Sequence, residues 1–414
     1  MPNLRRVVIT GFGLVSPLGN TIEAFTENVF AGKSGIKPFE GAFADKLKCK
    51  VSAQASFDPA DYFSQKSDYA ILDRNGQMAL HASIEAVKHA NLALNDDLKK
   101  RTGVYVGTGM GGILSVEDGY QTLYLKDENR LKPYTVLMCM YNSAASAIAT
   151  HFEVAGPNLT FSTACSSSAV AIGQAYKDIR LGDIDAALAG GTDAILAYAS
   201  IKSWEAIRTL AEEDAEDMSA SCKPFSADRS GLVIGEGAAT LVLEEYEHAK
   251  ARGATIYAEI VGYGAANDFK HIAIPSVEGQ AATMAAAMKN SGLNTSDIQY
   301  INAHGTGTKF NDETETNAIK QVFGAHANQL AVSSTKSMHG HLMGAAGALE
   351  AIITTLAVYH NQLPPTINLK KPDPTCDLDY VPNISRTVDR LEYAMSNSFA
   401  FGGTGAALIF KKMN

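Results

Sequence analysis

The chain has 414 residues, of which 46% are hydrophobic and 19% are charged, a composition typical of globular proteins with a large apolar core. Its length exceeds what one hydrophobic core usually supports, so two domains or two fused halves are expected. The net charge of −9 argues against nucleic acid or an anionic membrane as the main partner, while leaving room for a local basic patch that binds an acidic protein.

The cysteines are scattered and include no CxxC pair, so the sequence predicts neither a disulfide framework nor a zinc ribbon. Reduced thiols and a cytoplasmic location are expected. The N-terminal apolar run is too short and too broken by glycine for a signal peptide, and no stretch approaches the length of a membrane span. The five cysteines are Cys49, Cys139, Cys165, Cys222 and Cys376.

Apolar runs rich in β-branched residues alternate with helical patterns along the chain. The first two predicted strands run into glycine-rich turns, and the third precedes a charged helix that ends at Gly253. This alternation indicates an α/β architecture in which helices cover the sheets. The predicted strands are residues 6–10, 104–108, 239–243, 256–262 and 300–303.

The charged helix before Gly253 gives the best internal boundary, which divides the chain into residues 1–252 and 253–414. Each part contains a helix of very small side chains after a tight turn, CSSSAVAIGQAYKDI in the first and MGAAGALEAIITTLAVYH in the second. Small side chains let helices approach closely, so these segments are predicted to be paired central helices of two related halves.

The segment TFSTACSSSAVAIGQA, residues 160–175, places Cys165 between a strand and a helix. A cysteine at a helix N-terminus faces unpaired N–H groups and the positive end of the helix dipole, both of which favour the thiolate. The same N–H groups could stabilise an oxyanion. A buried structural cysteine is the commoner case for any single cysteine, but the strand–cysteine–helix setting favours a nucleophile.

Two histidines lie in glycine-rich turns of the second half. His304 follows a strand in NAHGTGT, with hydroxyls at Thr306 and Thr308, and glycines there let a substrate approach the backbone. His341 follows Lys336 in SSTKSMHGH, directly before a small-residue helix, where a neutral imidazole can donate a hydrogen bond. A solvated turn explains each histidine alone equally well, and zinc bound by one cysteine and two histidines is a minor alternative.

The last motif is NSFAFGGTG, in which a strand ends in Phe399 and Phe401 before two glycines. Aromatic side chains are commonly core residues. A phenylalanine directly before two glycines, however, sits on a hinge that could swing.

These four segments, in this order, resemble the elongating β-ketoacyl-acyl-carrier-protein synthases of thiolase fold, in particular the type II synthases of bacterial fatty acid synthesis. The resemblance covers the whole chain and includes VVITGFGLVSPLGN, PFSADRSGLVIGEGAATLVLEEYEHAKARGA, LPPTINL and CDLDYVP. It implies an α/β thiolase fold in which two related halves form a five-layered αβαβα architecture, residues 1–252 carrying the nucleophile and residues 253–414 the two catalytic histidines.

The resemblance also implies roles for individual residues. Cys165 matches the nucleophile that accepts the acyl chain, and His304 and His341 match the pair that promotes malonyl decarboxylation and stabilises the enolate. Lys336 matches the lysine that organises the site, and Phe401 the gate whose N–H, with that of Cys165, forms the oxyanion hole. Further matches are the supporting acids Asp268, Asp312, Glu315 and Glu350, the pantetheine contacts Thr306 and Thr308, and the acyl-pocket residues Met110 and Trp204.

Several residues depart from the usual pattern of these synthases. The usual motif is GFGGTN, and this chain has Ala400 in place of its first glycine and Gly405 in place of its asparagine. His339 replaces the threonine of the usual motif KSMTGH. The loop KFNDETET resembles that of aromatic and polyene polyketide ketosynthases, and SQKSDYAILD carries Asp68 and Tyr69 where the fatty acid enzymes have basic residues that dock the carrier. These departures favour a ketosynthase of a specialised polyene or polyketide pathway as the alternative to fatty acid elongation.

The predicted reaction joins an acyl chain on Cys165 to malonyl from an acyl carrier protein, with substrates held on phosphopantetheine and with no metal or other cofactor. A homodimer is expected, with a heterodimer containing a related ketosynthase-like subunit as the alternative. A chain-length-factor-like scaffold would lack the cysteine. A thiolase acting on coenzyme A would have a Cys–His arrangement, so His341 argues against that class.

Overall fold

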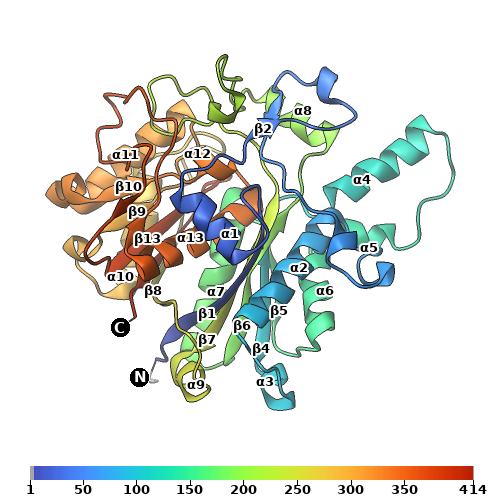
Figure 1. The fold of residues 1–414 in the computed structure, drawn as a ribbon, viewed down its shortest axis with the longest axis horizontal. Helices are drawn as coiled ribbons and strands as arrows, with labels where there is room; N and C mark the ends of the chain where they lie inside the picture. Colours follow the sequence, from blue (N-terminus) through green and yellow to red (C-terminus); the bar gives the residue numbers. More distant parts are fainter. Residues whose placement is uncertain (1–3, 414) are drawn as a thin grey trace.

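The computed structural model describes residues 4–413. Ten main strands form one continuous hydrogen-bonded sheet in the order β10-β9-β13-β14-β8-β1-β7-β6-β4-β5. Figure 1 shows the fold and labels most of these strands. They are β1 (Val7–Val15), β4 (Thr102–Gly107), β5 (Asn158–Phe161), β6 (Ala186–Asp193), β7 (Gly237–Glu245), β8 (Ala258–Asn267), β9 (Tyr300–Asn302), β10 (Ala331–Ser333), β13 (Tyr393–Phe399) and β14 (Thr404–Lys411). Two small ribbons pair β2 (Lys37–Pro38) with β3 (Val51–Ser52) and β11 (Gln362–Leu363) with β12 (Arg386–Thr387).

The ten strands divide into two runs of five with the same topology. In the first half the spatial order is β5-β4-β6-β7-β1, and in the second it is β10-β9-β13-β14-β8. Both runs pair their first three strands in parallel and their last two antiparallel. Antiparallel pairing of β1 with β8 joins the two runs. This repeated order confirms the prediction of two related halves.

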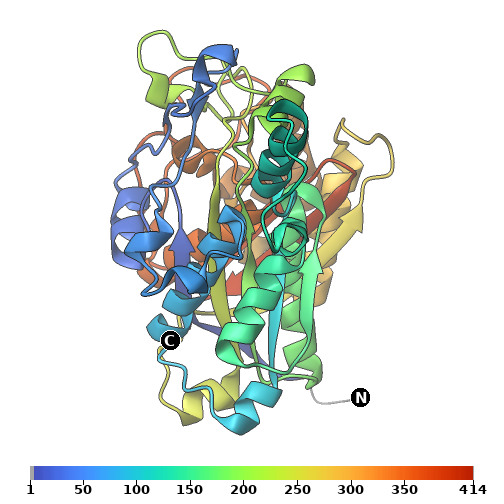
Figure 2. The ribbon, with the colours of Figure 1, turned by 90° about the vertical axis from the view of Figure 1, so that its right-hand side faces the viewer.

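Helices cover and separate the two halves of the sheet. The helices are α1 (Ile22–Phe30), α2 (Arg74–His89), α3 (Asp96–Lys100), α4 (Ile113–Tyr120), α5 (Thr135–Cys139), α6 (Ser143–Phe152), α7 (Ser167–Leu181), α8 (Tyr198–Ala206), α9 (Tyr246–Ala251), α10 (Val277–Ser291), α11 (Lys309–Phe323), α12 (Lys336–His339) and α13 (Ala346–His360). In the first half α2 and α6 lie on the outer face, and they face the viewer in Figure 2. On the opposite side α10 packs on β8 and β14, and α11 packs on α10.

The central helices α7 and α13 each contact strands of both halves and also contact one another. The resulting order of helix, sheet, helix, sheet, helix is the predicted five-layered αβαβα arrangement. Close packing at the centre requires small residues: a Cβ at Gly347 of α13 would lie 2.9 Å from the Cβ of Ala169 of α7. The small-residue runs in the sequence therefore mark helices that pack against one another.

Three buried clusters fill the spaces between these layers. Along β6, Ala187 and Ala189 face the central helices, while Ala186 and Leu188 face α2 and α6. In β14, Leu408 belongs to the central cluster and neighbouring side chains belong to the cluster under α10 and α11. Strands buried on both faces need apolar residues at every position, which is why they read as continuous apolar runs.

The predicted strands are found, with longer or slightly shifted bounds, as β1, β4, β7, β8 and β9. The boundary expected after Arg252 falls between α9 and β8, and its position stays a prediction. No described helix combines the length and the apolar character that a membrane span requires. The segment containing α4 extends away from the body of the molecule in Figure 1.

Candidate active site

Cys165 lies in a single 3₁₀ turn (Ala164–Ser166) between β5 and α7, as the sequence predicts. Ala164, the residue before it, has a φ of 51°, in the left-handed region that alanine rarely adopts. Serine hydroxyls hold the turn: Ser167 Oγ accepts from the N–H of Thr163 at 2.9 Å and donates to the carbonyl of Ala164 at 2.7 Å. The turn thus fixes the thiol at the start of α7, where it is almost completely buried.

His304 lies in the loop between β9 and α11. The carboxylate of Glu315 accepts from the N–H groups of His304 at 2.9 Å and of Gly305 at 2.8 Å, which fixes the backbone that carries the imidazole. Gly305 and Gly307 have positive φ values of 35° and 80°. Burial raises the pKa of Glu315 to about 7, with its backbone N–H partners acting in the opposite direction.

His341 lies between α12 and α13, and one hydrogen bond defines its tautomer. Its Nδ1 accepts from the N–H of Met343 at 3.0 Å, so the ring proton is carried by Nε2. The Nε2 of His341 has no hydrogen-bond partner within the described residues, although the side chain is buried. The ring therefore presents an unused N–H donor.

Lys336 and Glu350 form a fully buried ion pair next to His304. Lys336 Nζ is also 3.4 Å from His304 Nδ1, and an ammonium can only donate, so the proton of the His304 imidazole is carried by Nε2. Burial, followed by the charge of Lys336, lowers the pKa of both His304 and His341 well below the usual value. Both rings are consequently neutral at physiological pH.

The three reactive side chains converge. One ligand-type atom each of Cys165, His304 and His341 lies within 4.8 Å of the others. The imidazole rings are edge-to-face, with centroids 5.4 Å apart and planes at 84°. Because each Nδ1 is already engaged, both imidazoles present an N–H donor and no free acceptor nitrogen. This arrangement can stabilise negative charge on a substrate oxygen placed near the thiol.

The tautomers also bear on the alternative of a metal site. A metal ion would need an unprotonated ring nitrogen from each histidine. In this arrangement the unprotonated nitrogens are the Nδ1 atoms, which accept from Met343 in one ring and face Lys336 in the other. The hydrogen bonds thus favour substrate binding over metal coordination.

The thiol itself is protonated. Burial raises the pKa of Cys165 to about 12, although the charge of Lys336 and the N–H groups of Phe401 and Cys165 act in the opposite direction. The expected preference for thiolate at the helix N-terminus is therefore outweighed by desolvation. The N–H groups of Phe401 and Cys165 converge at the sulfur, where they are placed to serve as the predicted oxyanion hole.

A cavity of about 460 Å³ leads to these side chains. Thr306, Thr308 and Phe401 line it, which is compatible with their predicted roles along the path of a pantetheine arm. Trp204 also lines it, with its indole stacked on the Phe401 ring at a centroid distance of 5.8 Å. Met110 does not line this cavity and packs half-buried in the apolar cluster around Cys165.

Among the predicted supporting acids, Asp312 holds two distant segments. Its carboxylate accepts from the N–H of Phe225 at 2.8 Å and from the N–H of Gly307 at 3.2 Å. Asp268 lies beside the gate, where its carboxylate accepts from the N–H of Ser276 at 2.6 Å and its own N–H donates to the carbonyl of Gly403 at 2.8 Å. Both acids position loops that line the cavity.

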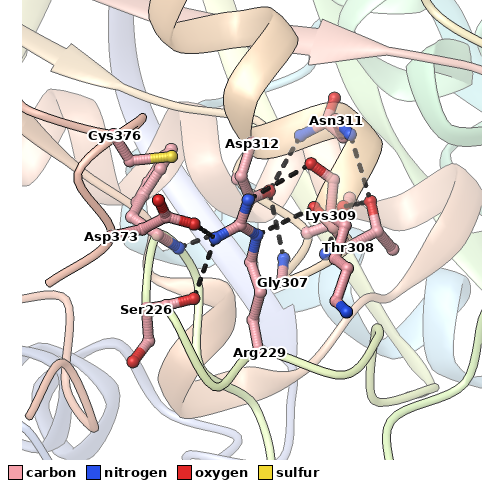
Figure 3. Close-up of polar contacts among 12 residues, drawn as sticks. Ser226, Arg229, Gly307, Thr308, Lys309, Asn311, Asp312, Asp373 and Cys376 are labelled. Carbon is pink, nitrogen blue, oxygen red and sulfur yellow. Dashed lines mark hydrogen bonds and ion pairs between the residues drawn. The ribbon is translucent and has the colours of Figure 1, made fainter. Parts of the chain in front are cut away.

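Two important residues escaped the sequence analysis. Figure 3 shows Arg229 between Asp373 and the loop that follows His304. Arg229 donates to the carbonyls of Thr308 at 3.4 Å and Lys309 at 3.3 Å and lies 3.8 Å from the carboxylate of Asp312. It lies in the segment PFSADRSG, where an arginine two residues before a glycine is the sequence feature that could have identified it.

The second such residue is Asp193, at the end of β6. Its carboxylate accepts from the N–H of Gly109 at 2.9 Å and of Gly344 at 2.5 Å, and from the hydroxyl of Thr108 at 2.9 Å. Burial raises its pKa to about 6. Asp193 therefore ties the loop that follows β4 to the turn after His341. The sequence feature that could have identified Asp193 is an aspartate at the end of a buried apolar strand.

The unusual residues lie close to the reactive side chains. His339 is fully buried, and its Nε2 lies 3.0 Å from the hydroxyl of Thr335. Burial lowers the pKa of His339 to about 3, so it adds no charge at neutral pH. Gly405 lines the cavity, and a Cβ there would come within 2.3 Å of the hydroxyl of Thr283. Thr283 thus occupies space that a larger residue at 405 would need.

Known proteins resemble the chain over its whole length. Residues 4–249 match the β-ketoacyl synthase N-terminal domain and residues 257–370 match the β-ketoacyl synthase C-terminal domain. The chain is 42% identical to 3-oxoacyl-[acyl-carrier-protein] synthase 2 of Staphylococcus aureus, covering 100% of this chain and 99% of that protein. It is 43% identical to nodulation protein E of Rhizobium meliloti, covering 99% of this chain and 100% of that protein.

Solved structures give the same result. A type II polyketide ketosynthase, in complex with its acyl-carrier protein and bound to the hexaketide, superposes with a TM-score of 0.91 at 34% identity, covering 99% of this chain and 100% of that chain. A β-ketoacyl synthase of Burkholderia phymatum superposes with a TM-score of 0.90 at 35% identity, again covering 99% and 100% of the two chains.

Proposed function

The chain belongs to the β-ketoacyl synthase family, and we propose that it extends an acyl chain on Cys165 by decarboxylative Claisen condensation with malonyl on an acyl carrier protein. It is a condensing acyltransferase of the 3-oxoacyl-[acyl-carrier-protein] synthase type, acting in fatty acid elongation. The observation that carries the residue assignment is the convergence of one buried thiol with two neutral N–H donors.

The first half-reaction transfers the acyl group to the enzyme. The sulfur of Cys165 attacks the carrier thioester, and the new carbonyl oxygen accepts from the N–H groups of Cys165 and Phe401. The bond to the pantetheine sulfur breaks, and the thiol proton of Cys165 leaves with that sulfur. The site offers no unprotonated imidazole nitrogen to hold the proton, since both Nδ1 atoms are engaged.

The second half-reaction forms the carbon–carbon bond. The thioester oxygen of malonyl accepts from the Nε2–H groups of His304 and His341, which stabilises the enolate left when carbon dioxide departs. The enolate carbon attacks the acyl carbonyl on Cys165, and the thiol is released after it takes up a proton. Burial, assisted by the charge of Lys336, lowers the pKa of both imidazoles, and Lys336 also defines the His304 tautomer, so Lys336 acts through the histidines.

We infer that the substrates arrive on the phosphopantetheine of an acyl carrier protein and that the enzyme works in the cytoplasm without a metal or further cofactor. Support comes from the cavity, whose lining includes both the exposed Phe310 and the buried Cys165. Thr306 and Thr308 line this path and offer hydroxyls to the amide groups of the arm. Asp268, Asp312, Glu315 and Glu350 are proposed as positioning residues, and Met110 and Trp204 as acyl-pocket residues.

A homodimer is also proposed, because β5 ends the sheet with β4 as its one hydrogen-bonded neighbour among residues 4–413. An unpaired sheet edge is a ready site for pairing with a second chain. The neighbouring segment from α4 to α6 exposes large apolar side chains, as expected for an obligate interface. They are Tyr120, Tyr124, Leu125, Leu131, Tyr134, Val136, Leu137, Met140 and Tyr141. Light scattering of the purified protein tests this, and an active monomer would contradict it.

The decisive experiment for the proposed function is a carrier panel. Purified enzyme is given malonyl- and acyl-loaded carrier proteins from fatty acid and polyketide systems, with acyl groups of several lengths, and 3-oxoacyl products are measured by mass spectrometry. Product formation with an acyl adduct on Cys165 is expected. Absence of both with every carrier would refute the assignment.

A second candidate is the same condensation in a specialised polyene or polyketide pathway. Three sequence features favour it: His339, the loop KFNDETET, and Asp68 and Tyr69 in SQKSDYAILD at positions where the fatty acid enzymes have basic residues. The carrier panel separates the candidates: a preference for polyketide carriers over the fatty acid carrier, under identical acyl loading, would support the specialised pathway.

A further inference from the structure

One buried amide in the wall of the cavity that leads to Cys165 has part of its hydrogen-bonding capacity unused. Gln280, near the start of α10, lines the cavity and is 2% exposed. Its Nε2 donates to Oδ1 of Asn311 at 3.2 Å, whereas its Oε1 has no hydrogen-bond partner within residues 4–413. A buried acceptor without a partner is costly, so such an atom in a binding cavity indicates a donor on the ligand.

A chain of hydrogen bonds decides which end of the Gln280 amide is unpaired. Both carboxylate oxygens of Asp312 accept from backbone N–H groups, so they act as acceptors toward Asn311 as well. Asn311 Nδ2 therefore donates to Asp312 Oδ1, at 3.2 Å, and the Oδ1 of Asn311 faces Gln280. Figure 3 shows Asn311 beside Asp312 and Thr308. Because Asn311 Oδ1 can only accept, Gln280 presents its NH2 group to it, and the Oε1 of Gln280 is left unpaired.

The two ends of this chain are anchored to the rest of the fold. At one end, the guanidinium of Arg229 lies 3.8 Å from the carboxylate of Asp312 and pairs with Asp373. At the other end, Ser276 caps the first turn of α10, the helix that carries Gln280. The direction of the Gln280 amide is thus set before a ligand enters, and an acceptor that is already oriented binds with little loss of conformational entropy.

The unpaired atom is an acceptor, which limits the groups that it can bind. Saturated acyl groups and the ionised malonyl group contain no N–H or O–H donor, whereas the pantetheine arm contains amide N–H groups. Thr306 and Thr308 line the same cavity with their hydroxyl oxygens 2.9 Å apart, so one O–H donates within the pair and the other can donate to the ligand. A trans amide points its C=O and N–H to opposite sides, so one amide of the arm can bind both the threonine pair and Gln280.

We propose that Gln280 is a further substrate-binding residue, whose Oε1 accepts a hydrogen bond from an amide N–H of the pantetheine arm. This inference rests on the proposed function, because it takes the ligand of the cavity to be a pantetheine thioester. Gln280 binds the arm and not its cargo, so its contribution is the same for acyl groups of every length. Asn311 is a positioning residue, since it acts through the orientation of the Gln280 amide.

The test removes the donor from the substrate and the acceptor from the enzyme, separately and together. Hexanoyl-pantetheine is compared with two analogues, in each of which one amide N–H is replaced by an ester oxygen, and the second-order rate constant for acylation of Cys165 is measured by intact-mass spectrometry. In the wild type, one analogue should react about 10-fold more slowly than hexanoyl-pantetheine, the cost of one hydrogen bond lost at a buried acceptor. In Gln280→Met, hexanoyl-pantetheine itself should lose that factor, and the same analogue should show no further loss.

Two further variants separate recognition of the amide from packing. Gln321→Met makes the same change at an exposed position of α11 outside the cavity lining, and it should keep the wild-type preference for the amide. Gln280→Glu keeps an oxygen acceptor on a side chain of equal length, so it should retain the preference as well. The comparison of substrates in the wild type tests the inference without any substitution.

Three results would overturn the inference. Equal rates for hexanoyl-pantetheine and both analogues in the wild type would show that the enzyme binds no N–H of the arm. A preference for the amide that is unchanged in Gln280→Met would assign that N–H to another acceptor. A preference that is lost in Gln280→Glu as well as in Gln280→Met would show that Gln280 acts through packing. Failure of hexanoyl-pantetheine to acylate the wild type would instead refute the proposed function.

Discussion

The turns that begin the two central helices have the same shape and different tasks. Ala164 precedes α7 with a φ of 51°, and Met343 precedes α13 with a φ of 48°; each opens a 3₁₀ turn that leads into a helix of 15 residues. The second residue of the turn is Cys165 in one half and Gly344 in the other. One half thus uses the position for a reactive thiol and the other for close packing.

The neighbours of each turn explain the division. The N–H of Gly344 donates to Asp193, and a Cβ on Gly344 would lie 2.5 Å from the nitrogen of Gly109. At Cys165 the same kind of turn opens toward the cavity and the two histidines. The backbone geometry is therefore shared by both halves, and the surroundings decide whether a side chain at that position can react.

The largest expected effect comes from removing the thiol. Cys165→Ala should abolish acyl transfer while leaving the midpoint of thermal unfolding close to that of the wild type, because the turn is held by serine hydroxyls and not by sulfur. Cys165→Ser should also lose acyl transfer, since a hydroxyl without an adjacent base is a weak nucleophile. Intact-mass spectrometry checks this, and an acyl adduct on Cys222 or Cys139 would contradict the assignment.

Removing either imidazole should affect the second half-reaction most. His304→Ala and His341→Ala should each slow malonyl decarboxylation by about 100- to 1,000-fold, the usual cost of one oxyanion donor. Acylation of Cys165 should persist at least in part. Carbon dioxide release and the mass of the acyl-enzyme are measured on the same samples, with Lys336→Met as a test of the positioning role. Normal condensation without one histidine would refute the two-donor mechanism.

A methyl group at the position equivalent to Cys165 should damage the fold. Gly344→Ala brings a Cβ within 2.6 Å of Asp193 Oδ2 and close to backbone atoms of Gly109. Overpacking of this kind costs about 1–3 kcal/mol in the free energy of unfolding. Urea unfolding measures it against Gly119→Ala in α4, where the nearest atom to the new Cβ is 3.7 Å away. Equal stability of the two variants would show that the turn of α13 tolerates a side chain.

His339 gives a pH test of the buried histidines. Its folded pKa is about 3 against a usual value of 6.5, so between these values the unfolded chain binds more protons, and the free energy of unfolding falls as the pH falls from 6.5. One such group contributes about 1.4 kcal/mol per pH unit. His339→Gln should make the loss of stability below pH 6.5 shallower, as measured by urea unfolding at several pH values. If the free energy of unfolding had the same pH dependence in the wild type and in His339→Gln, the neutral state of His339 would be contradicted.

The smallest expected effect concerns the gate. Trp204→Ala removes the ring that stacks on Phe401 and opens space in the cavity, so the product distribution should shift toward longer chains. The stability cost should stay below the ~3–5 kcal/mol of a fully buried aromatic, because Trp204 is half-buried. Trp204→Phe, which keeps an aromatic ring, is the control. An active alanine variant with unchanged products would leave Trp204 as a packing residue.

Local sequence was enough for much of the fold and the site. Continuous apolar runs predicted strands buried on both faces, and small residues after tight turns predicted the central helices. The strand–Cys165–helix pattern and the glycine-rich loops around His304 and His341 are local signals too. Each of these features depends on residues within a short stretch, because strand burial, turn geometry and helix starts are set by neighbours in the chain.

Contacts between distant segments were decided only by the tertiary structure. Asp193 and Gly344 are 151 positions apart, and Arg229 meets Asp373 from 144 positions away. The tautomers of the imidazoles depend on Lys336 and on the N–H of Met343, and the thiol is protonated because burial outweighs the helix terminus. Burial, hydrogen-bond partners and the electrostatic environment arise when separate segments pack together, so the sequence determined which groups are present and the tertiary structure determined their chemical states.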